Sequence, residues 1–266
     1  MSHKPIYDLI SLKGRSSLIT GAASGIGRAT TLRFGEAGSS LILVDIDNEG
    51  LRKVAEEVRD RYRVEVEAYK VDLSRKNEVD KLWRNLEGRE PDILVNIAGI
   101  YIFRDFLEID QGFLEKVMNV NLYSVLWMCQ HMVKRRLSKG GVIINVGSIE
   151  SILPFAKNLV HYDVSKIGVL GLTRALAREY GRRGFRVNIV IPGGIETESV
   201  KKLKKEALLK LKTDIIKTGI EFSRRLPMGR MGDPDEVARV ILFLASDLAS
   251  YVNGAAIPVD GGFLSA

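Results

Sequence analysis

Seven short apolar runs, each followed by a turn and then by a stretch of helical period, constrain this chain most strongly. The runs are largely continuous rather than alternating, which is typical of strands buried on both faces of a sheet. They occupy residues 17–19, 40–44, 64–71, 93–95, 142–146, 187–191 and 255–259. Segments of helical period lie between them, over residues 27–37, 49–61, 76–86, 113–136, 160–182 and 235–245. This alternation predicts an α/β fold with a seven-stranded parallel sheet and helices on both faces.

No Pro/Ser-rich linker and no internal repeat divides the 266 residues. We therefore predict a single doubly wound, Rossmann-type domain over residues 1–266. Residues 197–226 depart from the alternation, because they are rich in Lys, have amphipathic helical period and contain no strand. A half-buried helix with a solvated Lys face would explain them, but a long excursion without a strand is often a lid. We predict a helical lid over the substrate.

Composition excludes several classes of protein. Forty Lys and Arg residues against 33 Asp and Glu give a net charge of +7, yet the cations are spread along the chain and only 7% of residues are aromatic. A nucleic-acid-binding surface usually has a basic stripe with stacking aromatics, so we expect no nucleic-acid partner. The single Cys129 excludes an intrachain disulfide and a Cys-rich zinc site. Three scattered His residues predict no catalytic metal.

Signals for a membrane or for export are also missing from the sequence. No apolar stretch approaches the roughly 18 residues that a transmembrane helix needs. Asp8 and Ser11 interrupt the N-terminal segment, where a signal peptide would have a continuous apolar core. We therefore expect a cytoplasmic protein with no membrane partner.

A glycine-rich loop connects the first predicted strand to the helix that follows it. The loop reads TGAASGIG over residues 20–27. Glycines at this spacing permit a tight turn, a close approach of backbone to pyrophosphate, and close packing of helix on strand. The helix N-terminus adds free N–H groups and a positive dipole end. An ordinary glycine-rich turn is the alternative, but the strand before the loop, the helix after it and an acidic residue ending the next strand together favour a dinucleotide site.

That acidic residue, Asp45, distinguishes between the two nicotinamide cofactors. A carboxylate at the tip of the second strand accepts hydrogen bonds from ribose hydroxyls and repels a 2′-phosphate, although Asp here could simply cap the following helix. Ser24 precedes Gly25 and Ile46 follows Asp45, so no cation is placed for a 2′-phosphate. We predict NAD as the cofactor.

Tyr162 and Lys166 are four residues apart in a predicted helix, so their side chains share one face. A phenol has a pKa of about 10 and needs a nearby cation to act as acid or base at neutral pH. Taken alone, the two residues are more simply interpreted as accidental surface neighbours. Ser148, however, follows the predicted strand at 142–146, at the edge of the sheet where ligands bind in open α/β folds.

With these residues in place, the chain resembles the short-chain dehydrogenase/reductase family from Leu12 to Phe263. The resemblance rests on motifs that occur in the family's order and on a closing segment at residues 244–262. The motifs are TGAASGIG (20–27), DL (72–73), NIAG (96–99), NVNL (119–122), NVGS (145–148), YDVSK (162–166) and PGGIET (192–197).

Two positions depart from the family's usual pattern. Ile97 replaces the second Asn of an Asn-Asn-Ala-Gly motif, a position that is usually structural, so we expect little effect on catalysis. The segment from Ser148 to Tyr162 is one residue longer than usual. Either the loop at residues 154–157 absorbs the extra residue, or the substrate pocket is reshaped.

The resemblance implies a catalytic set of four residues. Tyr162 is expected to be the general acid in carbonyl reduction and the base in alcohol oxidation, and Ser148 to bind the substrate oxygen. Lys166 is expected to lower the pKa of Tyr162 and to hold the nicotinamide ribose, and Asn121 to support a water chain to Lys166. These roles suit hydride transfer, because the reaction makes or consumes an alkoxide.

The resemblance also implies which residues contact the cofactor. Asp45 matches the ribose selector, residues 72–73 the adenine pocket, residues 96–99 the adenosine-side wall, and residues 195 and 197 the nicotinamide carboxamide and pyrophosphate contacts. The predicted set is Gly21, Ser24, Gly25, Ile26, Gly27, Asp45, Asp72, Leu73, Asn96, Ala98, Gly99, Tyr162, Lys166, Pro192, Gly193, Ile195 and Thr197.

We therefore predict an NAD(H)-dependent oxidoreductase, a short-chain alcohol dehydrogenase or carbonyl reductase, that interconverts a secondary alcohol and a ketone. Tyr101, Ile102, Phe103, Glu150 and Phe155 fall on segments expected to border the pocket, and their mixture suggests a largely hydrophobic site with a polar edge. The leading substrate is accordingly a hydrophobic or cyclic ketone, and an NAD-dependent aldose 1-dehydrogenase is the second candidate.

An alternative of another class is a catalytically silent NAD-sensing binding protein. Family members of that kind tend to have lost the Tyr or the Lys, and this chain keeps both. The resemblance also implies a homotetramer, in which the predicted helix at 113–136 and the helix bearing Tyr162 pack across a subunit interface.

Overall fold

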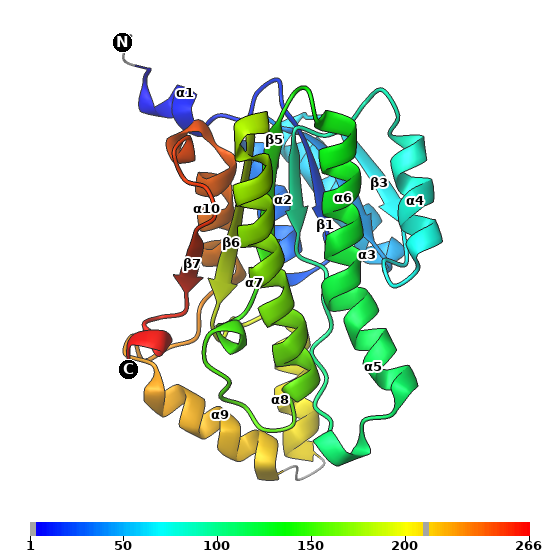
Figure 1. Ribbon diagram of the computed structural model, residues 1–266. Helices are drawn as coiled ribbons and strands as arrows, with labels where there is room; N and C mark the ends of the chain where they lie inside the picture. Colours follow the sequence, from blue (N-terminus) through cyan, green and yellow to red (C-terminus); the bar gives the residue numbers. More distant parts are fainter. Residues whose placement is uncertain (1–3, 210–212) are drawn as a thin grey trace.

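The seven apolar runs form one parallel sheet. In the computed structural model, which describes residues 4–209 and 213–266, the strands follow the order β3-β2-β1-β4-β5-β6-β7 (Figure 1). Every neighbouring pair is parallel. The strands are β1 (Ser16–Thr20), β2 (Ser40–Asp45), β3 (Val66–Lys70), β4 (Ile93–Asn96), β5 (Gly141–Val146), β6 (Phe185–Pro192) and β7 (Ala256–Val259).

This strand order confirms the predicted doubly wound α/β fold. The chain winds outward from β1 through β2 to β3, returns to β4 beside β1, and then winds the other way to β7. The winding direction therefore switches between β1 and β4, and a crevice for ligands forms outside the carboxyl ends of the strands at such a point.

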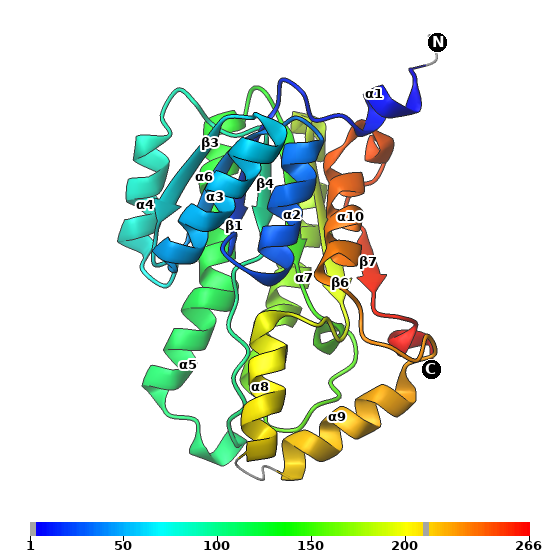
Figure 2. The same cartoon turned by 180° about the vertical axis from the view of Figure 1, so that it is seen from behind.

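Helices cover both faces of the sheet, as Figures 1 and 2 show from opposite sides. On one face lie α2 (Gly25–Glu36), α3 (Asn48–Tyr62) and α10 (Pro234–Ala245); on the other lie α4 (Lys76–Asn85), α6 (Ser124–Arg136) and α7 (Val160–Tyr180). Successive residues of β2 alternate between two cores: Leu41 and Leu43 pack under α2 and α3, whereas Ile42 and Val44 pack with the α4 and α6 side. Burial on both faces explains why the central strands read as continuous apolar runs.

The predicted helix at 113–136 is not continuous. It consists of α5 (Gln111–Met118), a π-helical turn (Asn119–Tyr123) and α6. Within the turn, the fully buried Asn121 amide accepts a hydrogen bond from Ile100 N (2.8 Å) and donates one to Ile100 O (2.9 Å). This pairing ties the helix to the loop after β4. Single π turns inside α-helices are frequent at functional sites.

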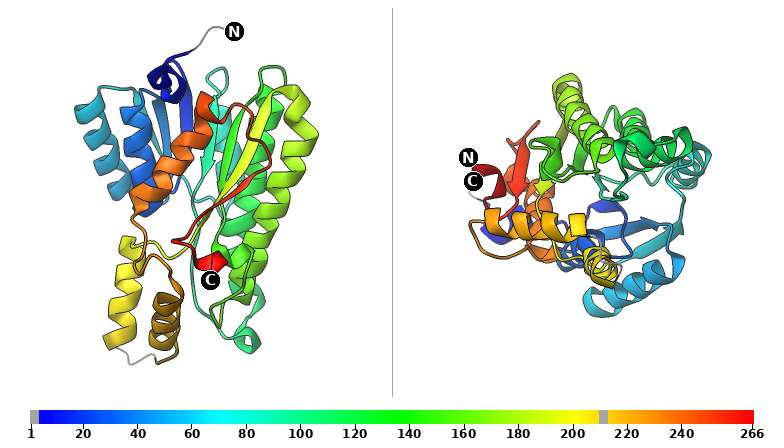
Figure 3. Two further views of the ribbon diagram at one scale, coloured as in Figure 1. Left: turned by 90° about the vertical axis from the view of Figure 1, so that its left-hand side faces the viewer. Right: turned by 90° about the horizontal axis from the view of Figure 1, so that it is seen from below.

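The strandless insert at 197–226 contains α8 (Glu198–Leu209) and α9 (Thr213–Arg225). Both helices lie beyond the carboxyl ends of the strands, where Figure 3 shows them projecting below the sheet together with α5. Residues 1–3 and 210–212 of the predicted domain lie outside the described residues. The insert is thus placed at the ligand-binding edge of the fold; its role as a lid stays a prediction.

The structure adds a short helix that the sequence does not predict, α1 (Ile6–Ile10), which has no buried residue. Its five residues are too few for a helical period to be visible in the sequence. Within the part of the chain that the structure describes, no helix is both long enough and apolar enough to cross a membrane.

Candidate active site

Most of the predicted site residues lie at the carboxyl edge of the sheet, because they end a strand or directly follow one. The glycine loop follows β1, Asp45 ends β2, Asn96 ends β4, Ser148 follows β5, and Pro192 ends β6. These strands are neighbours around the switch point between β1 and β4. One edge of the sheet thus brings together residues that are far apart in the sequence.

The glycine loop is packed too closely for side chains at two positions. Gly21 has φ +68°, and a Cβ there would lie 2.9 Å from Ala98 N. A Cβ on Gly27 would lie 1.8 Å from Gly21 O. The first glycine therefore lets β1 turn beside the loop after β4, and the last lets α2 begin against that turn, as the pyrophosphate-binding motif requires.

An acidic side chain already lies at the N-terminus of α2. Gly25 N donates a hydrogen bond to Glu198 Oε2 at 3.2 Å, and Thr197 lies against Gly25, with its Cγ2 3.0 Å from the position of a Cβ there. The first N–H groups of a helix have no partner within it and attract anions. Because a carboxylate takes up one of these groups, the loop fits the negatively charged pyrophosphate of a dinucleotide.

Asp45 is held in a defined orientation at the end of β2. Its Oδ2 accepts a hydrogen bond from Ala23 N in the glycine loop and its Oδ1 accepts one from Asp47 N, both at 2.9 Å. The cap of α3 is instead the Asp47 side chain, which accepts hydrogen bonds from Glu49 N and Gly50 N. Helix capping therefore does not account for Asp45, which fits a ribose-binding carboxylate.

The Asn96 side chain is buried and forms a hydrogen bond within the core of the protein. Its Nδ2 donates to Asn145 Oδ1 at 2.9 Å, and Asn145 Nδ2 donates to Thr173 Oγ1 at 2.9 Å, so that buried amides join β4, β5 and α7. At the unusual Ile97, the backbone N–H donates to Thr20 Oγ1 (3.0 Å). Asn96 thus fits the cofactor wall only through its backbone; Ala98 and Gly99 line the turn that follows.

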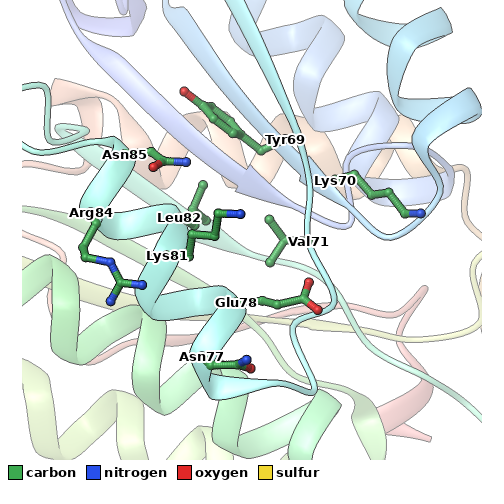
Figure 4. Close-up of a pocket in the computed structure, with 9 residues that line it drawn as sticks. All are labelled: Tyr69, Lys70, Val71, Asn77, Glu78, Lys81, Leu82, Arg84 and Asn85. Carbon is green, nitrogen blue, oxygen red and sulfur yellow. The ribbon is translucent and has the colours of Figure 1, made fainter.

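A groove of about 520 Å³ lies between β3 and α4 (Figure 4). It borders the predicted adenine-binding segment: Asp72 N donates to the carboxylate of Glu78, a groove residue, at 2.7 Å, and Leu73 is buried. Strands β2, β1 and β4 separate β3 from β5. The groove therefore lies on the adenine side of the expected cofactor site and away from Ser148.

The residues after β6 run back toward the glycine loop. Gly193 N donates to Val259 O at 3.0 Å, which ties this turn to β7. Ile195 is buried and pairs in a parallel bridge with Gly232. Thr197 then reaches Gly25, as described above. The segment that begins at Pro192 therefore crosses from β6 to the N-terminus of α2, where contacts to a pyrophosphate and a nicotinamide are expected.

Tyr162, Ser148 and Lys166 form one cluster. The Ser148 hydroxyl lies close enough to Tyr162 to lower the pKa of its phenol, and this influence favours the phenolate. Lys166 lies one helical turn further on, with Nζ 5.8 Å from the centroid of the Tyr162 ring. Lys166 is buried and donates to Val146 O at 2.9 Å. Asn121 lies close by, since both its Oδ1 and the Lys166 Nζ are near Gly99.

The pKa of Tyr162 differs from the expectation. Burial raises the pKa of Tyr162 to about 12, and the nearby Glu150 and Asp163 carboxylates add to this, so that the Ser148 hydroxyl offsets only part of the rise. Burial also lowers the pKa of Lys166 to about 8. Lys166 is not among the groups that shift the pKa of Tyr162 in the chain alone, so its effect on that pKa stays a prediction for the enzyme with its cofactor bound.

No cluster of three or more His, Cys, Asp or Glu side chains that could hold a metal ion occurs in residues 4–209 and 213–266. His161, next to Tyr162, is buried; its Nε2 bonds Ile102 O at 2.7 Å, and its ring packs edge-on against Phe113. His161 thereby fixes the loop after β4 against α7.

Comparison with known proteins identifies the family of this chain. The family model described as Enoyl-(Acyl carrier protein) reductase matches residues 21–264. The chain belongs to the short-chain dehydrogenase/reductase family. It is 36% identical over 258 residues to the 3-oxoacyl-(acyl-carrier-protein) reductase FabG of Aquifex aeolicus, covering 95% of this chain and 98% of the relative.

Other relatives in the short-chain dehydrogenase/reductase family are named for sugars and polyols. Galactitol 2-dehydrogenase (L-tagatose-forming) of Cereibacter sphaeroides is 35% identical over 258 residues, 95% of this chain and 96% of that protein. The structure named an NAD(P)-dependent gluconate 5-dehydrogenase from Beutenbergia cavernae, with bound NADP, superposes with a TM-score of 0.88 and 33% identity, covering 97% of this chain and 100% of that one. The chain is therefore an oxidoreductase, and these relatives differ in substrate.

Proposed function

We propose that this protein is an NAD(H)-dependent oxidoreductase that interconverts a secondary alcohol and a ketone, with Tyr162 as the acid/base. The observation that carries the proposal is the cluster at the carboxyl edge of β5, where the Ser148 hydroxyl lies close to Tyr162 and Lys166 Nζ lies 5.8 Å from the centroid of the Tyr162 ring. This cluster lies on the same edge as the glycine loop. When bound there, the nicotinamide would supply or accept the hydride.

The residues of the chain would then bind the substrate oxygen and transfer its proton. The Ser148 hydroxyl donates a hydrogen bond to the oxygen on which charge develops, and Tyr162 Oη delivers the proton during reduction or accepts it during oxidation. Ser148 is kept in place because its Oγ also accepts a hydrogen bond from Glu150 N at 3.2 Å. The pKa of about 12 in the chain alone favours the protonated phenol, which suits ketone reduction.

Lys166 and Asn121 would position the reacting groups. Lys166 Nζ uses one of its donors on Val146 O, so two remain for a ribose hydroxyl and a water molecule. A bound ribose and the phosphates would favour the charged form of Lys166, which would in turn favour the phenolate of Tyr162. Asn121 donates to Ile100 O, and this holds the π-helical turn in place beside Gly99.

We also propose NAD rather than NADP, on the orientation of Asp45, and a homotetramer. Apolar side chains on and near α7 support the oligomer: Tyr123, Val164 and Ile167 are 43%, 52% and 48% exposed. Clustered exposed apolar groups of this kind mark interaction surfaces. Light scattering coupled to size exclusion should give four times the mass of the chain, and a monomer would contradict this part of the proposal.

The enzymatic proposal is tested by rates of NADH consumption against cyclic and aryl ketones, ketoses and an acetoacetyl thioester. NADPH is run in parallel, and aldoses are assayed with NAD. Turnover of a ketone class with NADH is the expected result. Turnover of aldoses alone would favour the aldose 1-dehydrogenase. NADH binding without any turnover would favour the silent sensor.

A further inference from the structure

One phenol and two carboxyl groups lie near Tyr162, and the proposed mechanism does not use their side chains. Tyr101 comes from the loop after β4, Glu150 from the short turn after Ser148, and Asp163 from α7. The Tyr101 ring packs edge-on against the Tyr162 ring, with centroids 4.9 Å apart. The charges of Glu150 and Asp163 act on both phenols, and that of Glu150 acts on Asp163. Tyr101 therefore contacts Tyr162 directly, and the two carboxyl groups lie near enough for their charges to influence both phenols.

Glu150 is a buried carboxylate in a fixed orientation. The residue is 4% exposed, and its two oxygens accept hydrogen bonds from Phe155 N (2.8 Å) and Ala156 N (3.2 Å). The Phe155 side chain packs on Phe222 and Phe263, which holds the loop that supplies these N–H groups. Each carboxylate oxygen has a second lone pair, so Glu150 keeps the capacity to accept hydrogen bonds from a ligand.

Asp163 is buried with less compensation. It is 8% exposed, and its Oδ1 has no hydrogen-bond partner among the residues that the structure describes. Lys166, on the same helix, donates to Val146 O instead. Burial and the charge of Glu150 raise the pKa of Asp163 to about 7. An unpartnered buried carboxyl costs free energy, and such groups in a cleft are candidates for function.

We propose that Tyr101, Glu150 and Asp163 form a polar subsite that binds the hydroxyl groups of a substrate next to its reacting carbonyl. This inference rests on the proposed function and names its substrate class, a neutral polyol or ketose. Hydroxyl groups both donate and accept hydrogen bonds, so they can pair with the Glu150 carboxylate, a protonated Asp163 carboxyl and the Tyr101 phenol. A sugar acid would bring its own carboxylate beside that of Glu150 and be repelled.

The proposed subsite differs from the expectation of a largely hydrophobic pocket. Of the residues expected to border the pocket, Glu150 is a buried acid, and the Phe155 ring packs against Phe222 and Phe263. A simple hydrophobic ketone would leave the carboxylates without ligand partners. A site built to bind hydroxyls rejects an analogue that lacks them, because its buried polar groups then stay unpaired.

The test compares kcat/KM of the full-length protein with NADH for three ketones: a neutral ketohexose, a keto sugar acid and cyclohexanone. The variants are Tyr101→Phe, Glu150→Gln and Asp163→Asn, with Glu108→Gln as a matched control, since it removes the same charge at an exposed position. We expect the wild type to prefer the ketohexose. Each subsite variant should lose at least about tenfold in kcat/KM on the ketohexose, mainly through KM, and less than about threefold on cyclohexanone.

Other outcomes separate this inference from the proposed function. If the wild type prefers cyclohexanone or the sugar acid, or if the variants lose both activities equally, the subsite is refuted while the proposed oxidoreductase stands. If the wild type reduces none of the three ketones, the proposed function itself fails. Should Glu150→Gln fold poorly, Tyr101→Phe decides the matter, because it removes only a hydroxyl from a side chain that is 42% exposed.

Discussion

Replacing Asp45 by Asn should shift the cofactor preference of this enzyme from NADH toward NADPH. The change removes one negative charge at the tip of β2 and keeps an oxygen that can accept the hydrogen bond from Ala23 N. A 2′-phosphate bound beside Asp45 would place its charge about 4 Å from the carboxylate, where the repulsion is about 1–4 kcal/mol depending on the effective dielectric constant. Asp45 is partly exposed, so the lower part of that range applies.

The expected result for Asp45→Asn is a fall of about tenfold or more in the ratio of kcat/KM for NADH to kcat/KM for NADPH, since each 1.36 kcal/mol is tenfold. Fluorescence titration with each reduced cofactor gives the same comparison without a substrate. Asp47→Asn is the matched control: it removes a charge two residues away that caps α3. Because Asn caps a helix about as well as Asp does, this change should leave both the stability and the cofactor ratio nearly unchanged.

Two results would refute this reasoning about Asp45. One is a wild type that binds NADPH as tightly as NADH. The other is an Asp45→Asn protein whose ratio equals that of the wild type, which would leave Asp45 only its structural contacts to Ala23 and Asp47.

Two further predictions use groups that surround the site. Glu198→Gln should tighten NADH binding several-fold in a fluorescence titration, because the Glu198 carboxylate accepts a hydrogen bond from Gly25 N where a pyrophosphate is expected. Glu221→Gln, an exposed change on α9, is the control. Equal effects of both changes on NADH binding would contradict this role of Glu198. Asp163→Asn should raise the melting temperature increasingly between about pH 4 and pH 7. The folded chain holds a proton on Asp163, with a pKa of about 7, that the unfolded chain releases from about pH 4, so wild-type stability falls as pH rises through this window. A pH-independent difference in thermal melts would show that Asp163 ionises normally.

Much of the fold could be predicted, because strands that are buried on both faces of the sheet have continuous apolar sequences. In sheet order, the strands from β2 to β6 read as largely continuous apolar runs. Strand β3, at the edge of the sheet, contains the charged residues Glu67 and Lys70 and is shorter than the predicted run. The π-helical turn could not be foreseen, because one extra residue in the helix barely disturbs an apolar stripe. Its cause is a distant contact, the pairing of Asn121 with Ile100.

For the candidate site too, the position of most residues could be predicted from the sequence, whereas their burial could not. The glycine loop, Asp45, Ser148, Tyr162 and Lys166 could be placed on one edge, because each follows a strand or lies at a fixed helical spacing. Burial could not be predicted, and it sets the pKa values of Tyr162, Lys166 and Asp163. The sequence offered one signal for Asp163: it is an acidic residue directly after Tyr162, inside a predicted helix.

The proposed function depends most directly on Tyr162 as the acid/base, so the decisive measurement compares the wild type with Tyr162→Phe for both NADH binding and turnover of its best ketone. Tyr251→Phe, at a fully exposed position, is the control. We predict an unchanged dissociation constant for NADH and a kcat lower by about 100-fold or more, as expected for the loss of a general acid. A Tyr162→Phe protein that keeps more than about a tenth of the wild-type kcat would contradict the account, because another group would then supply the proton.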